Sequence, residues 1–168
     1  MNLQTKKLAV RAMLVALAMI LSWIEAQIPP LMMVPGMKLG FTNIVVLVAL
    51  YSLSEKDAFV INIVRILLVG FTFGNFYSMS YALAGGLISF LCMFLLKRYT
   101  TLNMLAVSVA GAIMHNVGQI FIAMFVMSTT KIFYYLPFLW ASGIVAGCFV
   151  GILSGLIIKR IPNIEKRK

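Results

Sequence analysis

Apolar residues fill six stretches of this chain, and short segments rich in polar and charged residues separate them. The stretches cover approximately residues 8–25, 39–53, 58–74, 77–96, 102–127 and 133–158. A helix of roughly 20 residues rises about 30 Å, which is the thickness of the hydrocarbon core of a bilayer. Most stretches approach or exceed that length, while the second and third are shorter. The pattern predicts an all-α membrane protein with six transmembrane helices in one bundle, a single domain over residues 1–168.

The distribution of charge predicts how the bundle is oriented. Hydrophobic residues make up 62% of the chain, and its net charge is +10. With both termini inside, the cytoplasmic segments hold Lys6, Lys7, Arg11, Lys56, Lys97, Arg98, Lys159, Arg160, Lys166, Arg167 and Lys168. The outer segments then hold only Lys38 and Lys131. The positive-inside rule therefore predicts that both termini are cytoplasmic. Because the basic residues follow this topology, the net charge gives no reason to expect a nucleic-acid partner.

The fifth stretch carries polar residues in its middle. His115, the only histidine in the chain, lies four residues before Gln119, so the two share one helix face with Asn116 beside them. Polar groups at that depth cost free energy unless they face a partner, a cavity or a ligand. A hydrogen bond between helices and a contact with a ligand are both consistent with this pattern. The trio is the first indication of a site.

The third stretch carries Arg65, with Asn62 on the same face. An arginine within the membrane is normally buried against a carboxylate, backbone carbonyls or an anionic ligand. No acidic residue lies inside a predicted span, and Glu25 lies at the outer edge of the first one. Arg65 therefore has a structural role, or it binds a substrate or a partner subunit.

The segment between the first two stretches is an outer loop, because three prolines and two glycines interrupt it. It is also rich in methionine, which suits a lid over a ligand or a plain hydrophobic plug, with a copper site as a weaker third reading. Together with the polar residues described above, this loop and the end of the third stretch predict a substrate site open to the outside. Its predicted residues are Lys38, Asn43, Arg65, Asn75, His115, Asn116 and Gln119. These side chains favour an amphipathic ligand with an anionic or carbonyl-rich edge.

Small residues recur at helical spacing in two stretches. The sixth contains an unbroken series four residues apart, formed by Gly143, Gly147, Gly151 and Gly155. Such a stripe lets another helix pack tightly against it. In the first stretch Ala12 and Ala16 have the same spacing. They either pack within the monomer or form a docking surface for a partner protein.

Residue patterns typical of catalysis are missing. The sequence has no phosphate-binding loop, no aspartate-rich cluster and no His or Cys spacing typical of a metal site. We therefore expect no catalytic residues, no metal and no cofactor. Polar groups at depth beneath an outer loop favour binding of a small molecule over turnover.

Several motifs resemble one known family. They are Pro35-Gly-Met-Lys-Leu-Gly-x-x-Asn43, Arg65-x-Leu-Leu-x-Gly70, Phe73-Gly-Asn75-Phe, Ala84-Gly-Gly86, Ser108-Val-Ala-Gly-Ala-x-x-His115-Asn-x-Gly-Gln119 and Tyr134-Tyr-Leu-Pro137. With them the chain resembles the Gx transporter family, also labelled heptaprenyl diphosphate synthase component I. That family is similar to the substrate-binding S components of energy-coupling-factor transporters.

The resemblance implies a six-helix binding subunit of a bacterial cell membrane, in contact with lipid. It also implies a transmembrane coupling protein with ATPase subunits, which would dock on an Ala-x-x-x-Ala motif such as Ala12 and Ala16. A flavin-like, vitamin-like or prenylated compound is the implied substrate. Two other functions follow from the same resemblance. One is a membrane subunit of flavin- or quinone-linked extracellular electron transfer, and the other is an accessory subunit in heptaprenyl diphosphate or menaquinone biosynthesis.

Overall fold

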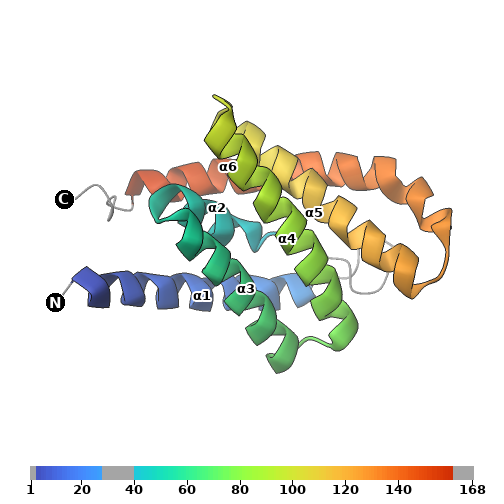
Figure 1. Ribbon diagram of the computed structural model, residues 1–168, viewed down its shortest axis with the longest axis horizontal. Helices are drawn as coiled ribbons and strands as arrows, with labels where there is room; N and C mark the ends of the chain where they lie inside the picture. Colours follow the sequence, from blue (N-terminus) through green and yellow to red (C-terminus); the bar gives the residue numbers. More distant parts are fainter. Residues whose placement is uncertain (1–2, 28–39, 161–168) are drawn as a thin grey trace.

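A computed structural model of the chain describes residues 3–27 and 40–160, and within them every regular element is a helix (Figure 1). The elements are α1 (Leu3–Gln27), α2 (Asn43–Ser52), α3 (Glu55–Thr72), α4 (Phe76–Tyr99), α5 (Met104–Val126), the short 3-10 helix η1 (Thr130–Tyr135) and α6 (Leu136–Arg160). Each of the six α-helices coincides with one predicted apolar stretch. The all-α fold class is thus confirmed.

Four segments of the described chain are long and apolar enough to cross a membrane. They are Lys7–Gln27, Phe76–Tyr99, Met104–Val126 and Thr130–Arg160. The protein is therefore a multi-pass membrane protein. The second predicted span differs, because α2 has 10 residues and rises only about 15 Å. It begins after Gly40, whose φ of 83° is incompatible with a helix.

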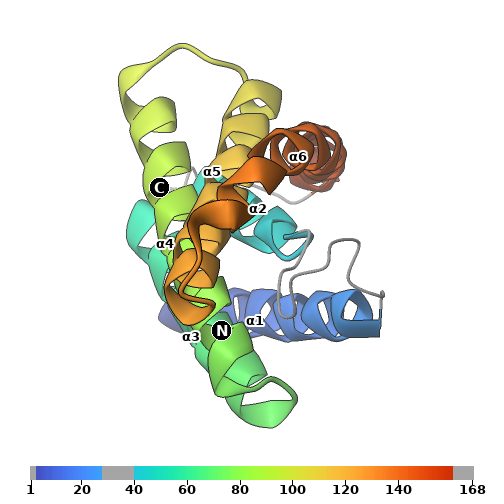
Figure 2. The ribbon, with the colours of Figure 1, turned by 90° about the vertical axis from the view of Figure 1, so that its right-hand side faces the viewer.

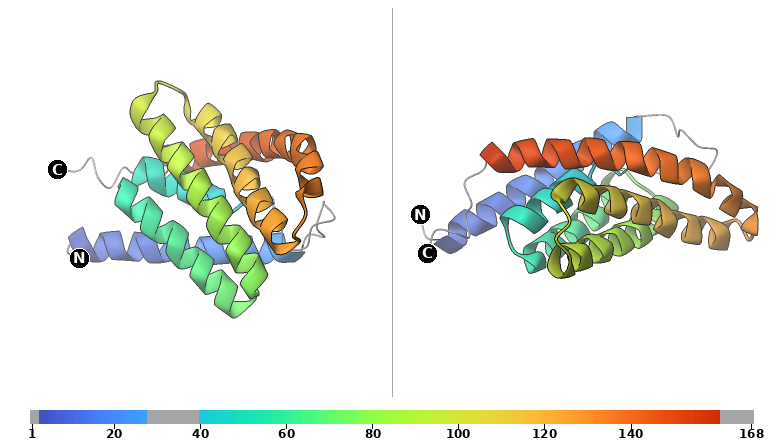
Figure 3. Two further views of the ribbon diagram at one scale, coloured as in Figure 1. Left: turned by 45° about the vertical axis from the view of Figure 1, so that its right-hand side comes forward. Right: turned by 90° about the horizontal axis from the view of Figure 1, so that it is seen from above.

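The helices form a sequence of neighbours around α2. α1 packs on α3, α3 on α4, α4 on α5 and α5 on α6. α2 contacts α1, α3, α4 and α6, and Figure 2 shows it between α1 and α6. The two views in Figure 3 show α3, α4 and α5 side by side, with the start of α1 and the end of α6 toward the same side. The short α2 thus packs against four longer helices.

The composition of α2 explains its central place. Its sequence is apolar on every side, and Asn43 and all seven residues from Ile44 to Leu50 are buried. A helix without a polar face is stable only when it is surrounded by other apolar surface. Leu14 of α1 and Val150 of α6 belong to the same apolar core.

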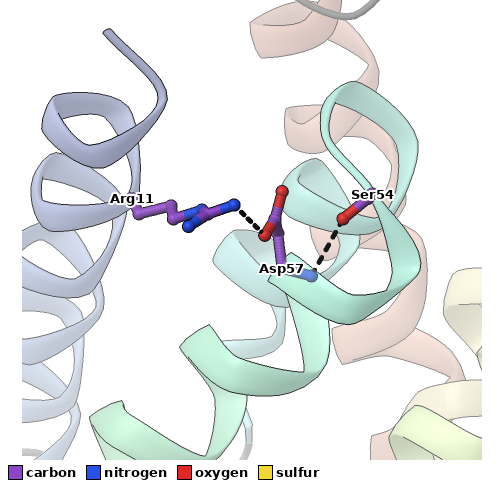
Figure 4. Close-up of polar contacts among 3 residues, drawn as sticks. All are labelled: Arg11, Ser54 and Asp57. Carbon is purple, nitrogen blue, oxygen red and sulfur yellow. Dashed lines mark hydrogen bonds and ion pairs between the residues drawn. The ribbon is translucent and has the colours of Figure 1, made fainter. Parts of the chain in front are cut away.

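Charged residues connect the helices at the end of the bundle where α1 starts. Arg11 of α1 forms an ion pair with Asp57 of α3, and the Asp57 backbone N–H donates to the Ser54 hydroxyl that caps α3 (Figure 4). Lys97 of α4 donates to the Leu50 carbonyl in the last turn of α2, at 2.6 Å. That bond satisfies one of the carbonyls that a helix leaves open at its C-terminus.

The glycine series of α6 lies against α5. A Cβ at Gly147 would lie 2.6 Å from the Val109 Cα, and one at Gly151 would lie 2.9 Å from a Leu105 methyl carbon. At Gly143 the nearest atom would be the Asn116 amide nitrogen at 3.1 Å, and at Gly155 only the Met104 methyl, also at 3.1 Å. The contact is thus tightest at the middle of the stripe. There the Ser108 hydroxyl donates to the Gly147 carbonyl at 2.7 Å.

Candidate functional site

A small polar cavity lies inside the bundle, in the part that α1, α3, α4 and α5 enclose. Its volume is about 20 Å³. The lining consists of Ser22, Glu25, Gly40, Thr42, Arg65, Ile66, Val69, Ser78, Ala82, His115 and Gln119. Seven of these eleven residues have polar side chains. Such a concentration of polar groups within apolar helices is costly, and it marks a functional site by default.

Glu25, in the last turn of α1, holds the turn that precedes α2. One carboxylate oxygen accepts the backbone N–H groups of Gly40 and Phe41, and the other accepts the Thr42 hydroxyl at 3.3 Å. The Ser22 hydroxyl, one turn earlier on α1, lies 3.1 Å from the Thr42 hydroxyl. Glu25 is only 5% exposed. A buried carboxylate thus closes one wall of the cavity.

Arg65 of α3 also lines the cavity and is buried. Its guanidinium donates twice to the Asn62 carbonyl oxygen, at 2.8 and 3.1 Å, and once to that of Asn43, at 3.4 Å. The Asn62 amide in turn donates to the Gly86 carbonyl at 3.0 Å. The interaction of Arg65 with these neutral oxygens fixes its orientation. Glu25, which lines the same cavity, attracts this charge electrostatically.

His115 and Gln119 come from successive turns of α5, and their Nε2 atoms lie 3.1 Å apart. The imidazole lies directly on the α4 backbone, since a Cβ at Gly85 would lie 2.9 Å from both its Cε1 and Nδ1 atoms. A Cβ at Gly118 would be 2.7 Å from the Ala84 carbonyl oxygen. Glycines on both helices therefore allow the close approach that places His115 in the cavity wall.

The cavity brings together a carboxylate, an imidazole and a guanidinium, those of Glu25, His115 and Arg65, in a small volume. A space of roughly 10–15 Å³ is needed for one water molecule, whereas pockets for small organic ligands occupy roughly 300–1,000 Å³. The cavity therefore has room for about one water molecule. Within residues 3–27 and 40–160, no three His, Cys, Asp or Glu side chains gather as a metal site requires. The arrangement suits hydrogen bonding and charge recognition.

Comparison with known protein families gives one match, to the model described as Heptaprenyl diphosphate synthase component I, over residues 14–157. The chain belongs to this family. The match runs from α1 into the last turn of α6, so it includes every helix that lines the cavity. Neither curated proteins nor solved structures give a match. The family description implies that a component I protein has a partner component in a complex.

In this component I protein, three of the seven predicted substrate residues line the cavity: Arg65, His115 and Gln119. Asn43 lies directly behind them as an acceptor for Arg65. The sequence prediction from three separate stretches thus leads to one location. Lys38 lies outside the described residues.

Asn116 and Asn75 lie outside the cavity lining. Asn116 is buried, and its amide donates to the Leu139 carbonyl of α6 at 2.7 Å, so it connects two helices. Asn75 is exposed and caps α4, accepting the Ser78 backbone N–H at 2.8 Å. Both side chains have structural partners, which their positions in the sequence did not reveal.

Sequence reasoning left Glu25, Ser22, Thr42 and Asn62 out of the predicted site. The sequence pattern puts Glu25 at the outer edge of the first span, but α1 continues to Gln27 and its buried face includes that carboxylate. A signal was present in the sequence. Leu14, Ala18, Ser22 and Glu25 follow one another at spacings of four, four and three, and all are buried. When the buried face of a helix ends in polar residues, those residues indicate a polar site inside the bundle.

Ala12 and Ala16 belong to a different face of α1. Both are exposed in the described structure, and so are the large apolar residues Met13 and Ile20. The face that contains them contacts none of the other described helices closely enough to be buried. The alternative that these alanines pack inside the monomer is therefore disfavoured.

Proposed function

We propose that this protein is the small-molecule-binding membrane subunit of a transporter, similar to an S component of an energy-coupling-factor system. The observation that carries the proposal is the buried cavity in which Glu25, Arg65, His115 and Gln119 meet. Keeping these groups away from water inside apolar helices has a cost that packing alone does not explain. A site for a polar ligand supplies the reason.

The charges of the cavity define the ligand class. Glu25 lines the same cavity as Arg65 and attracts it electrostatically, so the site as a whole is less cationic than the sequence alone indicated. A ligand with a carbonyl-rich or carboxylate edge would accept hydrogen bonds from Arg65 and Gln119. The apolar wall formed by Ile66 and Val69 suits the rest of an amphipathic molecule, such as a flavin-like, vitamin-like or prenylated compound.

Such a ligand is larger than the cavity, so its entry requires a wall to move. The wall most easily released is the turn before α2, because Gly40, Phe41 and Thr42 all donate hydrogen bonds to the Glu25 carboxylate of α1. A ligand carboxylate or carbonyl that competes for the same donors would loosen this turn. Binding and opening would thereby be linked through one side chain.

The exposed face of α1 is the proposed docking surface for a transmembrane coupling protein with ATPase subunits. Ala12 and Ala16 lack bulk, so a partner helix can approach the backbone there. In this proposal both termini lie in the cytoplasm of a bacterial cell membrane, in agreement with the positive-inside rule.

The family description supports a second function, an accessory membrane subunit of a prenyl diphosphate synthase. In that case the partner is a synthase subunit, and the cavity serves stability or contact with the prenyl compound. The two functions differ in which protein docks. They therefore predict different proteins in the purified complex.

Ligand binding tests the first function. Isothermal titration of the purified protein with flavins, vitamins and prenylated quinones should identify a ligand whose affinity falls on Arg65→Met and on His115→Ala. The matched control is Ser108→Ala, which removes a buried hydroxyl bonded to Gly147 outside the cavity. An identified ligand that binds both cavity variants as tightly as the wild type would place the binding site elsewhere.

Co-purification tests the partner. Wild-type protein should bring down a coupling protein with ATPases, and the double variant Ala12→Leu, Ala16→Leu should lose them while retaining ligand binding. Ala141→Leu is the control, because Ala141 is an exposed alanine on α6. Recovery of a prenyl synthase subunit in place of ATPases would favour the second function.

A further inference from the structure

A second concave site, unrelated to the polar cavity, lies between α3 and α4 on the outside of the bundle. It is an open groove of about 450 Å³, lined by Glu55, Lys56, Phe59, Val60, Phe90 and Phe94. That volume is within the range of pockets for small organic ligands. Apart from the two charged residues at one end, the lining is apolar. The groove therefore has an apolar length and a charged end.

Aromatic rings form the apolar part of the groove. The Phe59 and Phe90 ring centroids are 5.4 Å apart at a tilt of 56°, and the Phe90 and Phe94 rings are stacked with centroids 6.3 Å apart. Phe59 and Val60 are 42% and 52% exposed. Because α4 is one of the helices apolar enough to cross a membrane, we expect this surface to face the hydrocarbon chains of the bilayer. The rings give such a chain a defined path.

Two cations, Lys56 and Arg98, lie at the charged end of the groove. Lys56 is exposed and, among the described residues, forms no ion pair. Arg98 lies over the Phe94 ring, with its guanidinium carbon 5.7 Å from the ring centroid. It also contacts Glu55 at 3.6 Å, in a pair whose side chains are 54% and 40% exposed. Glu55 neutralises one of these two cations, so the end of the groove retains a net positive charge.

We propose that this groove binds one anionic phospholipid of the membrane. One acyl chain lies along Phe59, Val60, Phe90 and Phe94, and the phosphate is held by Lys56 and Arg98. Two features of the structure support this occupant together. The apolar length matches a hydrocarbon chain, and its charged end lies where the helices carry their basic residues. Basic pockets beside transmembrane helices favour anionic headgroups in this way.

Native mass spectrometry of the intact protein tests the proposal. The protein is titrated with phosphatidylglycerol and, separately, with phosphatidylcholine that has the same acyl chains. We expect one phosphatidylglycerol to bind more tightly than phosphatidylcholine. Each basic side chain near a headgroup contributes roughly fivefold in affinity. The double variant Lys56→Gln, Arg98→Gln should therefore weaken phosphatidylglycerol on the order of 25-fold and leave phosphatidylcholine nearly unchanged.

Two further variants make the test specific. Lys159→Gln, Arg160→Gln removes the same charge from the last turn of α6, away from the groove, and should retain the preference for phosphatidylglycerol. Val60→Trp fills the groove at an exposed position and should reduce binding of both lipids. The proposal is overturned if the two lipids bind equally to the wild type or if both charge variants lose binding alike. Retained lipid binding in Val60→Trp would also overturn it, as would a protein chain occupying the groove.

Discussion

Two single substitutions in the glycine series of α6 should have opposite effects on stability. At Gly147 a Cβ would lie 2.6 Å from the Val109 Cα, which is backbone and cannot rotate away. Carbon atoms make favourable contact at roughly 3.5–4.0 Å, so Gly147→Ala must separate α5 and α6 by about 1 Å. At Gly155 the same methyl group meets only the end of the flexible Met104 side chain.

The expected magnitudes follow from three effects. Overpacking costs about 1–3 kcal/mol, and stretching the Ser108–Gly147 hydrogen bond costs about 0.6 kcal/mol more. Replacing glycine by alanine within a helix returns about 1 kcal/mol. Gly147→Ala should therefore lose about 0.6–2.6 kcal/mol, whereas Gly155→Ala should gain up to about 1 kcal/mol. Gly147→Leu, with a far larger side chain, should be worse than either.

Thermal unfolding of the purified variants in one detergent measures this difference. For a chain of this size, 1 kcal/mol corresponds to a change in Tm of about 2–4 °C. We expect Gly147→Ala to melt about 1–10 °C below the wild type and Gly155→Ala to melt at or above it. If both variants gain stability equally, the middle of the stripe is not in contact with α5, and the packing described for these helices is incorrect.

Three further changes test other parts of the structure. Asn116→Leu should lower stability by about 0.6–2 kcal/mol, because the buried Leu139 carbonyl loses a donor from the neighbouring helix. Thermal unfolding measures this loss, and an unchanged Tm would contradict the bond. Ser54→Ala removes the cap of α3 and should cost about 1 kcal/mol, with Ser54→Asp as the variant that retains the cap. Glu25→Gln and Arg65→Met should each destabilise, and the double variant should lose less than the sum, because each single change leaves a buried charge unbalanced. Strictly additive effects would mean that the two charges do not interact.

Hydropathy alone was sufficient to predict the number and positions of the helices, because each apolar stretch is bounded by polar segments. It could not predict the role of α2. A 10-residue apolar helix and a short transmembrane span have the same composition, and only the contacts of α2 with four neighbours distinguish them. Those contacts depend on the way in which the longer helices cross one another. The crossing depends in turn on close packing at residues such as Gly118 and Gly147.

The residues of the cavity were predictable to the extent that polar residues inside apolar helices are conspicuous. Arg65, His115 and Gln119 were found for that reason and line one cavity. Glu25 was not, because the depth of a residue near a helix end depends on where the helix stops. Asn75 illustrates the converse: an asparagine at the start of a helix is as well suited to capping as to binding a ligand, and in the structure it caps α4.

The short central helix has a consequence for the biogenesis of the protein. α2 rises only about half the thickness of the hydrocarbon core, and α3 carries Arg65, whose insertion at the centre of a lone helix is disfavoured by about 2.5–3.5 kcal/mol. α2 is enclosed only when α6, which follows it by more than 80 residues along the chain, packs on it. The hairpin of α2 and α3 should therefore remain with the insertion machinery until α6 has been synthesised. Chains that stop before Leu136 should be degraded faster than full-length chains in a pulse-chase experiment, and equal lifetimes would show that α2 is accommodated without α6.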